Sequence, residues 1–372
     1  MQRNKHKKEY FEGCLIGGAI GDALGYPVEF LSYSQIQKTY GEHGICKFDL
    51  NKSGVAEISD DTQMTLFTAN GILLGDTRRK MRGIGGFPPA DYVRMAYKDW
   101  YYTQTHPKST YKGVSWLTSV DALYNTRYPG NTCMASLASK NYYSIAQPAN
   151  NSKGCGGVMR VAPYGLFYGW IPDRKLFLKE AAEIGAITHG HDMSHLSCAY
   201  IADIIGQIIY FCRDKDSIET IAKRALADVD LCGFSHKTEF ETIINTAITL
   251  AHNEQSDFSN ISQLGEGWTA EEAAAIAIYS AIKHQNNPLE GIAAAVNHNG
   301  DSDSTGAIAG NILGAWHGIS AFPKAYTTSL ELASTILEIA DDLAKGCPMS
   351  EYSSHYDSQW VKKYIEYANP YE

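Results

Sequence analysis

The chain has 372 residues, and 44% of them are hydrophobic, which is enough to bury a large core in one domain or in two ordinary ones. Its 32 basic and 41 acidic residues give a net charge of −9 at pH 7, so we do not expect a general binder of nucleic acids or of anionic membranes. Helical patterns recur without a break in composition, so we predict one domain.

Eight cysteines are spread along the chain without any Cys-x-x-Cys spacing, and most of them have apolar or glycine-rich neighbours. This pattern predicts reduced thiols in a cytoplasmic protein. No apolar run approaches the length of a membrane span. Residues 1–9, which include Lys5, Lys7 and Lys8, are predicted to form a flexible basic arm ahead of a domain that covers residues 10–372.

Apolar residues recur at helical spacing among glycines from Tyr10 to about Gly25, which predicts a helix packed closely against its neighbours. The segment that follows, Val28-Glu29-Phe30, has an acidic residue between two apolar ones. Two interpretations of Glu29 stay open, a charge on a loop surface and a gated active-site acid with a raised pKa. Residues 31–58 show no regular period and are expected to be rich in loops.

The next stretch of interest is Ser59-Asp60-Asp61-Thr62, which precedes apolar residues at helical spacing. Adjacent carboxylates at a helix start repel each other, and burial of both without a counter-charge is costly. A helix cap needs only one of them. In isolation, the pair is therefore expected to be a solvated N-cap.

A glycine-rich loop, Gly154-Cys155-Gly156-Gly157, lies near the middle of the chain. It precedes an apolar helical run from Val161 to Tyr168, so its backbone N–H groups are candidates for anion binding at a helix N-terminus. Such dipoles would let an acidic protein hold a phosphate-bearing ligand. The spacing matches neither a Walker nor a Rossmann loop, and most glycine-rich loops are only turns.

Helical patterns dominate the rest of the chain, and no strand alternation stands out. We therefore predict an all-α fold, with many short to medium helices around one core. Predicted helices begin near residues 62 and 89, and the glycine- and proline-rich stretch 83–89 is predicted to connect them. Further helices are predicted to cover roughly 173–187, 194–212, 215–228, 238–253, 270–284, 288–297, 304–318 and 328–345.

Two loops between these helices carry further candidate residues. Thr188-His189-Gly190-His191 interrupts two helical patterns, and both histidines are expected to cap a helix or to lie on a loop surface. Trp268 follows Gly267 in the second loop. It is either an aromatic residue of an active-site lid or a buried residue.

The stretch Gly300-Asp301-Ser302-Asp303-Ser304-Thr305-Gly306 has two carboxylates two residues apart, followed by two hydroxyl groups. A serine or threonine there is expected to cap the helix that follows. Oxygen-rich side chains are the ligands that Mg²⁺, Mn²⁺ or Ca²⁺ prefers. Together with the distant pair Asp60-Asp61, this stretch predicts the two sides of a site for two cations.

Taken together, these pieces resemble the ADP-ribosylglycohydrolase family, which includes ADP-ribosylarginine hydrolases and the dinitrogenase reductase activating glycohydrolase. The resemblance depends on the order in which the pieces occur over residues 13–318, namely Gly21 to Gly25 with Glu29, Ser59 to Met64, Gly154 to Arg160, Thr188-His189, Gly265 to Trp268 and Gly300 to Thr305. The stretches Gly-Asp-Ser-Asp-Ser-Thr and Gly-Cys-Gly-Gly-Val-Met-Arg are most similar to the arginine-specific branch. The resemblance implies a compact all-α domain that removes ADP-ribose from arginine side chains of proteins.

The resemblance also implies a site with two Mg²⁺ or Mn²⁺ ions. Position by position, the metal ligands would be Ser59, Asp60, Asp61, Asp301, Asp303 and Ser304. The catalytic acids would be Glu29, Asp60, Asp61 and Asp303, with Glu29 mobile near the second metal. The residues that hold the ADP-ribose moiety would be Gly154, Cys155, Gly156, Gly157, Val158, Met159, His189 and Trp268. Residues 31–58 and 105–150 match the family poorly, which leaves the identity of the substrate open.

Three functions remain open from the sequence. A metal-dependent hydrolase of ADP-ribosylated arginine would reverse a regulatory modification or give immunity against an ADP-ribosylating toxin. A hydrolase of the same fold could act on serine-linked ADP-ribose or on a small ADP-ribosyl molecule. The third is a non-catalytic ADP-ribose-binding protein, against which the retained clusters of acids and the glycine-rich loop speak.

Overall fold

The computed structural model describes residues 8–82, 88–109, 111, 113–212 and 215–367. Within these ranges the protein is one compact domain of helices joined by loops, and pairing between extended segments is limited to isolated bridges. The predicted all-α fold is confirmed. No single helix in the described part of the chain is long and apolar enough to cross a membrane, although Lys8–Val28 and Tyr33–Tyr40, bent by 97°, pass that test together on length and composition alone.

The first half of the chain supplies eight α-helices to the described structure. They are α1 (Lys8–Gly25), α2 (Tyr33–Tyr40), α3 (Asp60–Arg82), α4 (Pro89–Thr105), α5 (Asn131–Ala138), α6 (Ala162–Tyr168), α7 (Arg174–Ala186) and α8 (Asp192–Gln207).

The second half continues in the same way. Its α-helices are α9 (Ile218–Asp228), α10 (Lys237–Leu250), α11 (Asp257–Ile261), α12 (Ala270–Lys283), α13 (Pro288–Val296), α14 (Ser302–His317), α15 (Lys324–Ser329), α16 (Ala333–Lys345) and α17 (Ser358–Val361). Short 3₁₀ segments are η2 (Tyr26–Val28), η3 (Trp116–Ser119), η4 (Asp121–Tyr124), η5 (Cys155–Arg160), η7 (Val229–Cys232) and η8 (Ile319–Ala321), and π-helical turns are η6 (Ile208–Cys212) and η9 (Lys362–Glu366).

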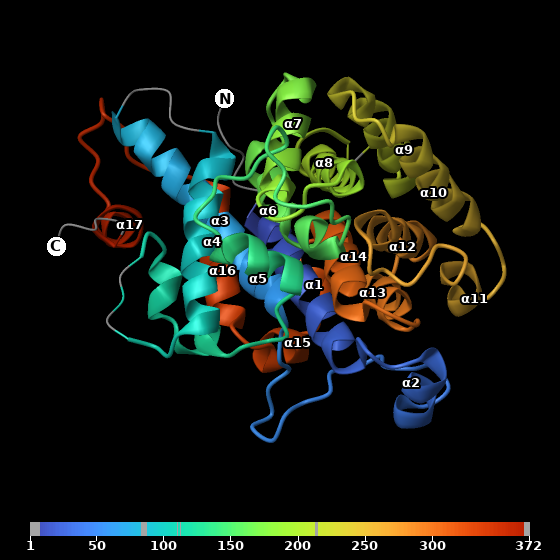
Figure 1. The fold of residues 1–372 in the computed structure, drawn as a ribbon. Helices are drawn as coiled ribbons and strands as arrows, with labels where there is room; N and C mark the ends of the chain where they lie inside the picture. Colours follow the sequence, from blue (N-terminus) through green and yellow to red (C-terminus); the bar gives the residue numbers. More distant parts are fainter. Residues whose placement is uncertain (1–7, 83–87, 110, 112, 213–214, 368–372) are drawn as a thin grey trace.

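Two helices at the centre of the molecule, α1 and α14, touch along their backbones (Figure 1). A Cβ atom at Gly17 would lie 2.3 Å from Gly310 O, and one at Gly21 would lie 1.9 Å from Gly306 O. The glycines recur at every fourth residue, so the same close approach is repeated one turn further along at Gly13. Because this crossing leaves no room for side chains, it fixes the register between the two helices.

That register places the end of α1 beside the start of α14. A Cβ atom at Gly25 would lie 2.3 Å from the backbone of Ser302, inside the acidic stretch. Residues near the beginning of the chain, such as Asp22 and Glu29, are thereby brought to a stretch that follows them by more than 250 positions along the sequence.

The other helices surround this central pair (Figure 1). Helix α3 packs on α4 and α6, whereas α12 and α13 pack against α14, and α8 lies against α6, α7 and α12. Their apolar side chains form one continuous core, in which Trp100, Tyr97 and Tyr200 are among the largest fully buried residues. A core of this size keeps the central pair rigid.

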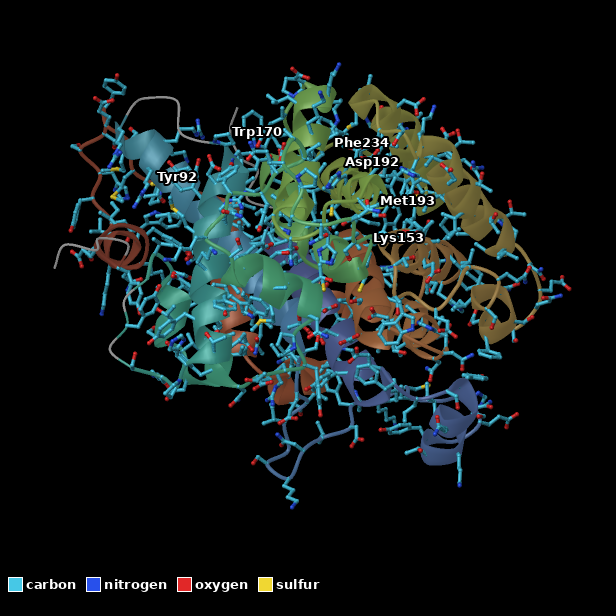
Figure 2. The ribbon with its side chains drawn as sticks, in the orientation of Figure 1. Tyr92, Lys153, Trp170, Asp192, Met193 and Phe234 are labelled. Carbon is cyan, nitrogen blue, oxygen red and sulfur yellow. The ribbon has the colours of Figure 1, made fainter. Side chains whose placement is uncertain are left out.

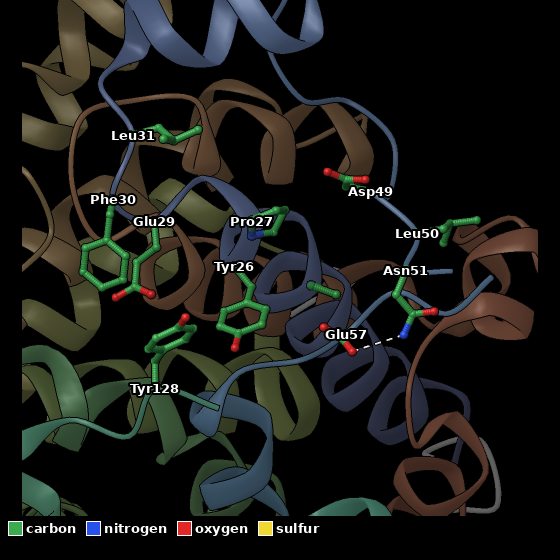
Figure 3. A pocket seen from close by; sticks show the side chains of 11 residues that line it. Tyr26, Pro27, Glu29, Phe30, Leu31, Asp49, Leu50, Asn51, Glu57 and Tyr128 are labelled. Atoms are coloured by element: carbon green, nitrogen blue, oxygen red, sulfur yellow. Dashed lines mark hydrogen bonds between the residues drawn. The ribbon is translucent and has the colours of Figure 1, made fainter. Parts of the chain in front are cut away.

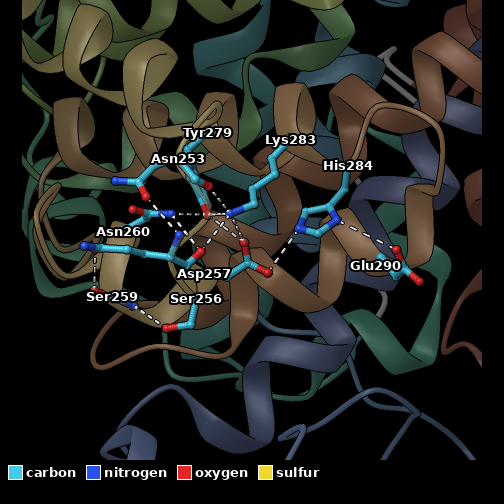
Figure 4. Close-up of polar contacts among 10 residues, drawn as sticks. Asn253, Ser256, Asp257, Ser259, Asn260, Tyr279, Lys283, His284 and Glu290 are labelled. Carbon is cyan, nitrogen blue, oxygen red and sulfur yellow. Dashed lines mark hydrogen bonds and ion pairs between the residues drawn. The ribbon is translucent and has the colours of Figure 1, made fainter.

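A polar cluster fastens the short helix α11 to α12 (Figure 4). Asp257 accepts a hydrogen bond from Tyr279 Oη at 2.6 Å, and its other oxygen lies 3.0 Å from His284 Nε2. On the same helix, Phe258 stacks on Tyr33 of α2 with 4.0 Å between the ring centroids. A helix of five residues is unstable in isolation, so α11 depends on these contacts and in turn supports α2.

The helices predicted from the sequence are present, with shifted ends. The pattern predicted over 194–212 divides into α8 and the π-helical turn η6. Residues 31–58, which were expected to be rich in loops, also contain the short helix α2. Ser32 and Gln35 form a capping box at its start. The helix is too short to produce a long periodic pattern in the sequence.

Parts of two further predictions fall outside the described residues. These are residues 1–7 of the predicted basic arm and residues 83–87 of the predicted connector between α3 and α4. The last two residues of the arm, Lys8 and Glu9, form the beginning of α1.

Replacement of Gly17 by leucine tests the contact between α1 and α14. The side chain would collide with the backbone of Gly310, so we expect the free energy of unfolding to fall by at least about 2 kcal/mol, measured by urea denaturation. Gly130→Ala is the matched control, because its φ of −57° suits alanine and nothing lies within 4 Å of the added Cβ atom. Equal stability of the two variants would contradict the close contact.

Candidate active site

The acidic stretch at residues 300–306 opens helix α14, and its cap is an aspartate. Asp301 Oδ1 accepts a hydrogen bond from Ser304 N at 3.3 Å, and Asp301 Oδ2 accepts one from the thiol of Cys155 at 2.7 Å. The expectation of a serine or threonine cap was therefore wrong. Thr305 Oγ1 lies 2.7 Å from Ala295 O, within the core, and does not cap the helix. Both carboxylates of the stretch are buried.

The start of α3 is held by a residue of α1. Asp22 is fully buried and accepts hydrogen bonds from Ser59 N at 2.8 Å and from Thr62 N at 3.0 Å, and the hydroxyl of Thr62 contacts the same carboxylate. Ser59 Oγ accepts a further bond from Asp61 N at 3.1 Å. Because Asp22 and Ser59 take the N–H groups of this turn, the carboxylates of Asp60 and Asp61 are left for the pocket.

The two acidic stretches meet in one pocket of about 200 Å³. Asp60 and Asp61 reach it from α3, and Asp301 and Asp303 reach it from α14. Glu29 lies at its edge, and single oxygens of Glu29, Asp301 and Asp303 lie within 4.8 Å of one another. The fold thus joins segments about 240 residues apart, as the sequence predicted.

The carboxyl groups of this cluster interact strongly with one another. Burial, followed by the charge of Asp303, raises the pKa of Asp61 well above its ordinary value, and the same two causes raise the pKa of Asp60. Burial and then Asp303 raise the pKa of Glu29 to about 10 and that of Asp22 to about 7. The protein alone therefore opposes full ionisation of these acids.

The cluster fits a divalent cation. Asp61 Oδ2 is buried without a hydrogen-bond partner, and no ion pair reaches Asp60, Asp61, Asp301 or Asp303 from any side chain that the structure describes. The donors are carboxylate oxygens, which hard cations such as Mg²⁺ and Mn²⁺ prefer. A bound cation would supply the positive charge that the surrounding side chains do not.

A buried arginine lies behind the pocket and fixes its histidine. Arg160 is fully buried, its guanidinium lies 4.5 Å from the ring centre of Tyr97, and its Nη2 donates to Thr188 Oγ1 at 2.6 Å. Thr188 Oγ1 in turn lies 2.8 Å from His189 Nδ1. Burial and then the charge of Arg160 lower the pKa of His189 to about 3, so a neutral imidazole lines the pocket.

The two histidines of this loop have different positions. His191 caps α8, with its Nδ1 accepting a hydrogen bond from Met193 N at 3.1 Å, as expected. His189 is only 3% exposed and lines the pocket, so the expectation of a cap or a loop surface was wrong for this residue. Sequence reasoning from the residues alone had no signal that separates the two.

The glycine-rich loop crosses directly in front of His189. A Cβ atom at Gly156 would lie 2.8 Å from His189 Cε1, so only glycine permits this approach. Gly154 N and Cys155 N already donate to Ser152 Oγ and Trp268 O, at 3.3 and 3.2 Å. Any anion contact from the loop would therefore come from amides beyond Cys155.

The loop is anchored to α12 by Lys153, which is labelled in Figure 2. Lys153 O accepts a hydrogen bond from Ala270 N at 2.8 Å, and Lys153 Nζ pairs with Glu271. These contacts join the glycine-rich loop to the segment that carries Trp268. The two walls of the pocket are therefore linked to each other.

Aromatic side chains surround the mouth of the pocket. Phe30 stacks on Trp268 with 5.8 Å between ring centroids and meets Tyr128 edge-on at 6.4 Å. Trp268 is 39% exposed, so of its two interpretations the structure excludes a buried residue. Figure 3 shows Glu29 between Phe30 and Tyr128.

Most of the residues predicted for ADP-ribose binding line this pocket, namely Gly154, Cys155, Gly156, Met159, His189 and Trp268. Gly157 and Val158 do not line it. Gly157 faces Gly185 and Ser194, and Val158 is buried. Among the predicted metal ligands, Ser59 is buried beside the cluster without lining the pocket, whereas Ser304 lines it.

The sequence reasoning missed several residues of this site. Asp22 belongs to the Gly-Asp-Ala-Leu-Gly segment, but nothing in the sequence indicated that its carboxylate reaches α3. Tyr128 and the segment from Gly130 to Cys133 line the pocket from a region without a regular pattern. A left-handed backbone at Tyr128, with φ of 50°, carries no sequence signal at a tyrosine.

A family model and several known proteins match this chain. The family model described as ADP-ribosylglycohydrolase matches residues 3–352. The chain belongs to the ADP-ribosylglycohydrolase family. Members of this family hydrolyse ADP-ribosylated substrates and generally use divalent metal ions, which agrees with the acidic cluster of the pocket.

Individual relatives are distant but cover nearly the whole chain. The uncharacterised protein YegU of Escherichia coli is 26% identical over 89% of this chain and 94% of its own length. ADP-ribosylhydrolase ARH3 of Danio rerio is 23% identical, with 90% and 89% covered. ADP-ribosylarginine hydrolase Tri1 of Pseudomonas putida is 25% identical, with 91% and 78% covered.

A solved structure shows the same fold. The chain described as an ADP-ribosylglycohydrolase-related protein complex has a TM-score of 0.55 and 20% identity to this protein. The match covers 92% of this chain and 99% of the other.

The acidic cluster predicts opposite effects of Asp61→Asn with and without metal. In the presence of EDTA we expect the variant to unfold at a higher temperature than the natural protein, because the amide removes one of several mutually repelling buried acids. With Mn²⁺ at about 100 times its dissociation constant, the natural protein should gain about 2.7 kcal/mol. The variant should gain less. Thermal unfolding followed by circular dichroism measures both effects.

Glu239→Gln serves as the control, since Glu239 is exposed and lies outside the pocket. It should respond to EDTA and Mn²⁺ like the natural protein. An Asp61→Asn variant with an unchanged response to Mn²⁺ would show that the cluster does not hold the cation.

Proposed function

We propose that the protein is a divalent-metal-dependent hydrolase that removes ADP-ribose from arginine side chains of modified proteins. The observation that carries this proposal is the convergence of Asp60, Asp61, Asp301 and Asp303 at one pocket in front of a glycine-rich loop. Membership of the ADP-ribosylglycohydrolase family supports the chemistry.

Two Mg²⁺ or Mn²⁺ ions are proposed to bind between the acidic stretches. The ligands on the α3 side would be Ser59, Asp60 and Asp61, and those on the α14 side Asp301, Asp303 and Ser304. When bound, such a pair of cations polarises the ribose hydroxyl groups and lowers the pKa of a water molecule. Asp22 has a supporting role, because its hydrogen bonds to Ser59 and Thr62 hold the α3 ligands in place.

Hydrolysis breaks the C–N bond between the ribose and the guanidine group, joins the oxygen of water to the ribose carbon and returns a proton to the leaving nitrogen. Glu29 lies between the acidic cluster and the mouth, where its carboxyl group can pass a proton to the leaving nitrogen. His189 is proposed to hydrogen-bond the ribose from the opposite wall.

The rest of the ADP-ribose group is proposed to lie along the glycine-rich loop. Gly154, Cys155, Gly156 and Met159 line the pocket beside His189. Gly157 and Val158 lie behind them and support the turn. Trp268 closes the same wall with an exposed aromatic face, on which a planar group can stack.

The mouth of the pocket favours arginine as the modified residue. Phe30, Tyr128 and Trp268 present aromatic rings beside the carboxyl group of Glu29. A guanidinium group stacks on aromatic rings, whereas a serine side chain does not. The similarity to ADP-ribosylarginine hydrolase Tri1 supports the same linkage.

Incubation with a peptide that carries ADP-ribose on arginine tests the proposal. We expect release of free ADP-ribose with Mg²⁺ or Mn²⁺ and none with EDTA, measured by chromatography. Asp303→Ala should lower the turnover number by at least about 100-fold, since the loss of a metal contact removes several kcal/mol of stabilisation from the transition state. Glu239→Gln should keep full activity.

The same experiment with a serine-linked peptide distinguishes the linkage. Faster release from serine than from arginine would replace arginine as the proposed target. Full activity in a metal-free preparation would overturn the metal-dependent mechanism. Binding of ADP-ribose by calorimetry without release from either peptide would identify a binding protein.

A further inference from the structure

A second, larger cavity adjoins the active-site pocket (Figure 3). It has a volume of about 550 Å³ and lies between the end of α1 and the segment around residues 49–51. Glu29 and Tyr128 line both cavities. These two side chains therefore form a shared wall, and a substrate leaving the active site past this wall enters the second cavity, which we call the acceptor groove.

The acceptor groove carries negative charge. Asp49 and Glu57 line it beside the carboxyl group of Glu29, and none of the described lining residues is basic. Asp49 is exposed and accepts a hydrogen bond from Tyr40 Oη at 2.7 Å, and no ion pair of Asp49 occurs within the described ranges. Its charge is therefore available to a ligand.

Only part of the charge of Glu57 is neutralised by the protein. Arg127 Nη2 lies 3.3 Å from Glu57 Oε1, but the same nitrogen donates to both carboxylate oxygens of Glu331, at 2.9 and 3.1 Å. One cation is thus shared between two carboxylates. The Glu57 side chain is 38% exposed, so it can also meet a charge from solvent.

Aromatic side chains line the groove beside these acids. Tyr26 and Tyr128 lie 5.9 Å apart between ring centroids, and Phe30 and Tyr128 lie 6.4 Å apart. Phe30 is 68% exposed and Tyr128 is 72% exposed, so both rings are accessible to a ligand. Aromatic faces next to carboxylates form a surface suited to arginine and lysine side chains.

The wall opposite these rings is held in a fixed shape. Asn51 Oδ1 accepts hydrogen bonds from Ser53 N at 2.9 Å and from Val55 N at 3.1 Å, and Asn51 Nδ2 donates to Glu57 Oε1 at 3.1 Å. The turn therefore keeps Glu57 and Asp49 on the groove without a bound partner. A pre-formed site loses little conformational entropy when a ligand binds.

We infer that the acceptor groove binds basic residues that flank the modified arginine on the substrate protein. This inference rests on the proposed arginine-linked activity and adds a preference among arginine-modified targets. The three supporting observations are the wall shared with the active-site pocket, the acidic charge that the protein only partly neutralises and the exposed aromatic rings. A volume of about 550 Å³ holds a ligand of the size of one or two long side chains.

Two arginine-modified peptides and one small substrate test the inference. The peptides differ only at the residues next to the modified arginine, which are lysine in one and glutamate in the other, and the small substrate is free ADP-ribosylarginine. We expect the natural protein to have a lower KM for the lysine peptide, by about tenfold at low salt, with similar turnover numbers. The preference should weaken at high salt, because exposed charges are screened.

The double variant Asp49→Asn, Glu57→Gln removes two charges and keeps the oxygen atoms that accept hydrogen bonds from Tyr40 and Asn51. Its preference for the lysine peptide should fall by about fivefold, as expected for two exposed ion pairs. Its activity on free ADP-ribosylarginine should not change, which also shows that the variant is folded. The matched control, Glu239→Gln with Glu254→Gln, removes two exposed charges that line neither cavity and should keep the full preference.

Each outcome has one meaning. Three outcomes would refute the inference about the acceptor groove and leave the arginine-linked activity intact. These are equal KM values for the two peptides, a preference for the glutamate peptide, and an unchanged preference for the lysine peptide in the double variant. Failure of the natural protein to release ADP-ribose from free ADP-ribosylarginine and from both peptides would instead refute the proposed function itself.

Discussion

The backbone contact between α1 and α14 is the constraint on which the rest of the structure depends. Facing glycines allow the two helices to approach until a single added methyl group at Gly17 or Gly21 would collide with a carbonyl oxygen. At this separation neither helix can slide or rotate past the other. The contact therefore fixes where Asp22, at the end of α1, lies relative to Asp303, at the start of α14.

The second acidic stretch is positioned by this central pair and not by its own helix alone. Asp22 accepts hydrogen bonds from the N–H groups at the start of α3 and thereby holds Asp60 and Asp61 in place. The Asp22 carboxyl group is itself one of the buried acids of the site, and its pKa is raised by burial and by Asp303. Burial of so many like charges opposes stability. No described side chain forms an ion pair with the four aspartates of this cluster. The cluster therefore fits a positively charged ligand.

The shared wall formed by Glu29 and Tyr128 separates two cavities of different character. The pocket with the aspartates is smaller and contains buried carboxylates, whereas the neighbouring groove is larger and is lined by exposed aromatic and acidic side chains. Glu29 lines both cavities, so the proposed chemistry at the ribose and the proposed recognition of the rest of a substrate meet at one side chain. The aromatic contacts of Phe30 with Trp268 and with Tyr128 connect this wall to the glycine-rich loop.

The sequence by itself determined the helical class, the main helices and the two acidic stretches, because these features depend on local periodicity and on the chemistry of neighbouring residues. Order along the chain also pointed to the family. The tertiary structure alone decided that Asp301 caps its helix, that Asp22 supports α3, and that His189 is buried while His191 is a cap. It also decided that Tyr128 stands between two cavities. These outcomes depend on contacts between segments far apart in the chain. No local sequence pattern shows which residues the packing of α1 against α14 will bring together.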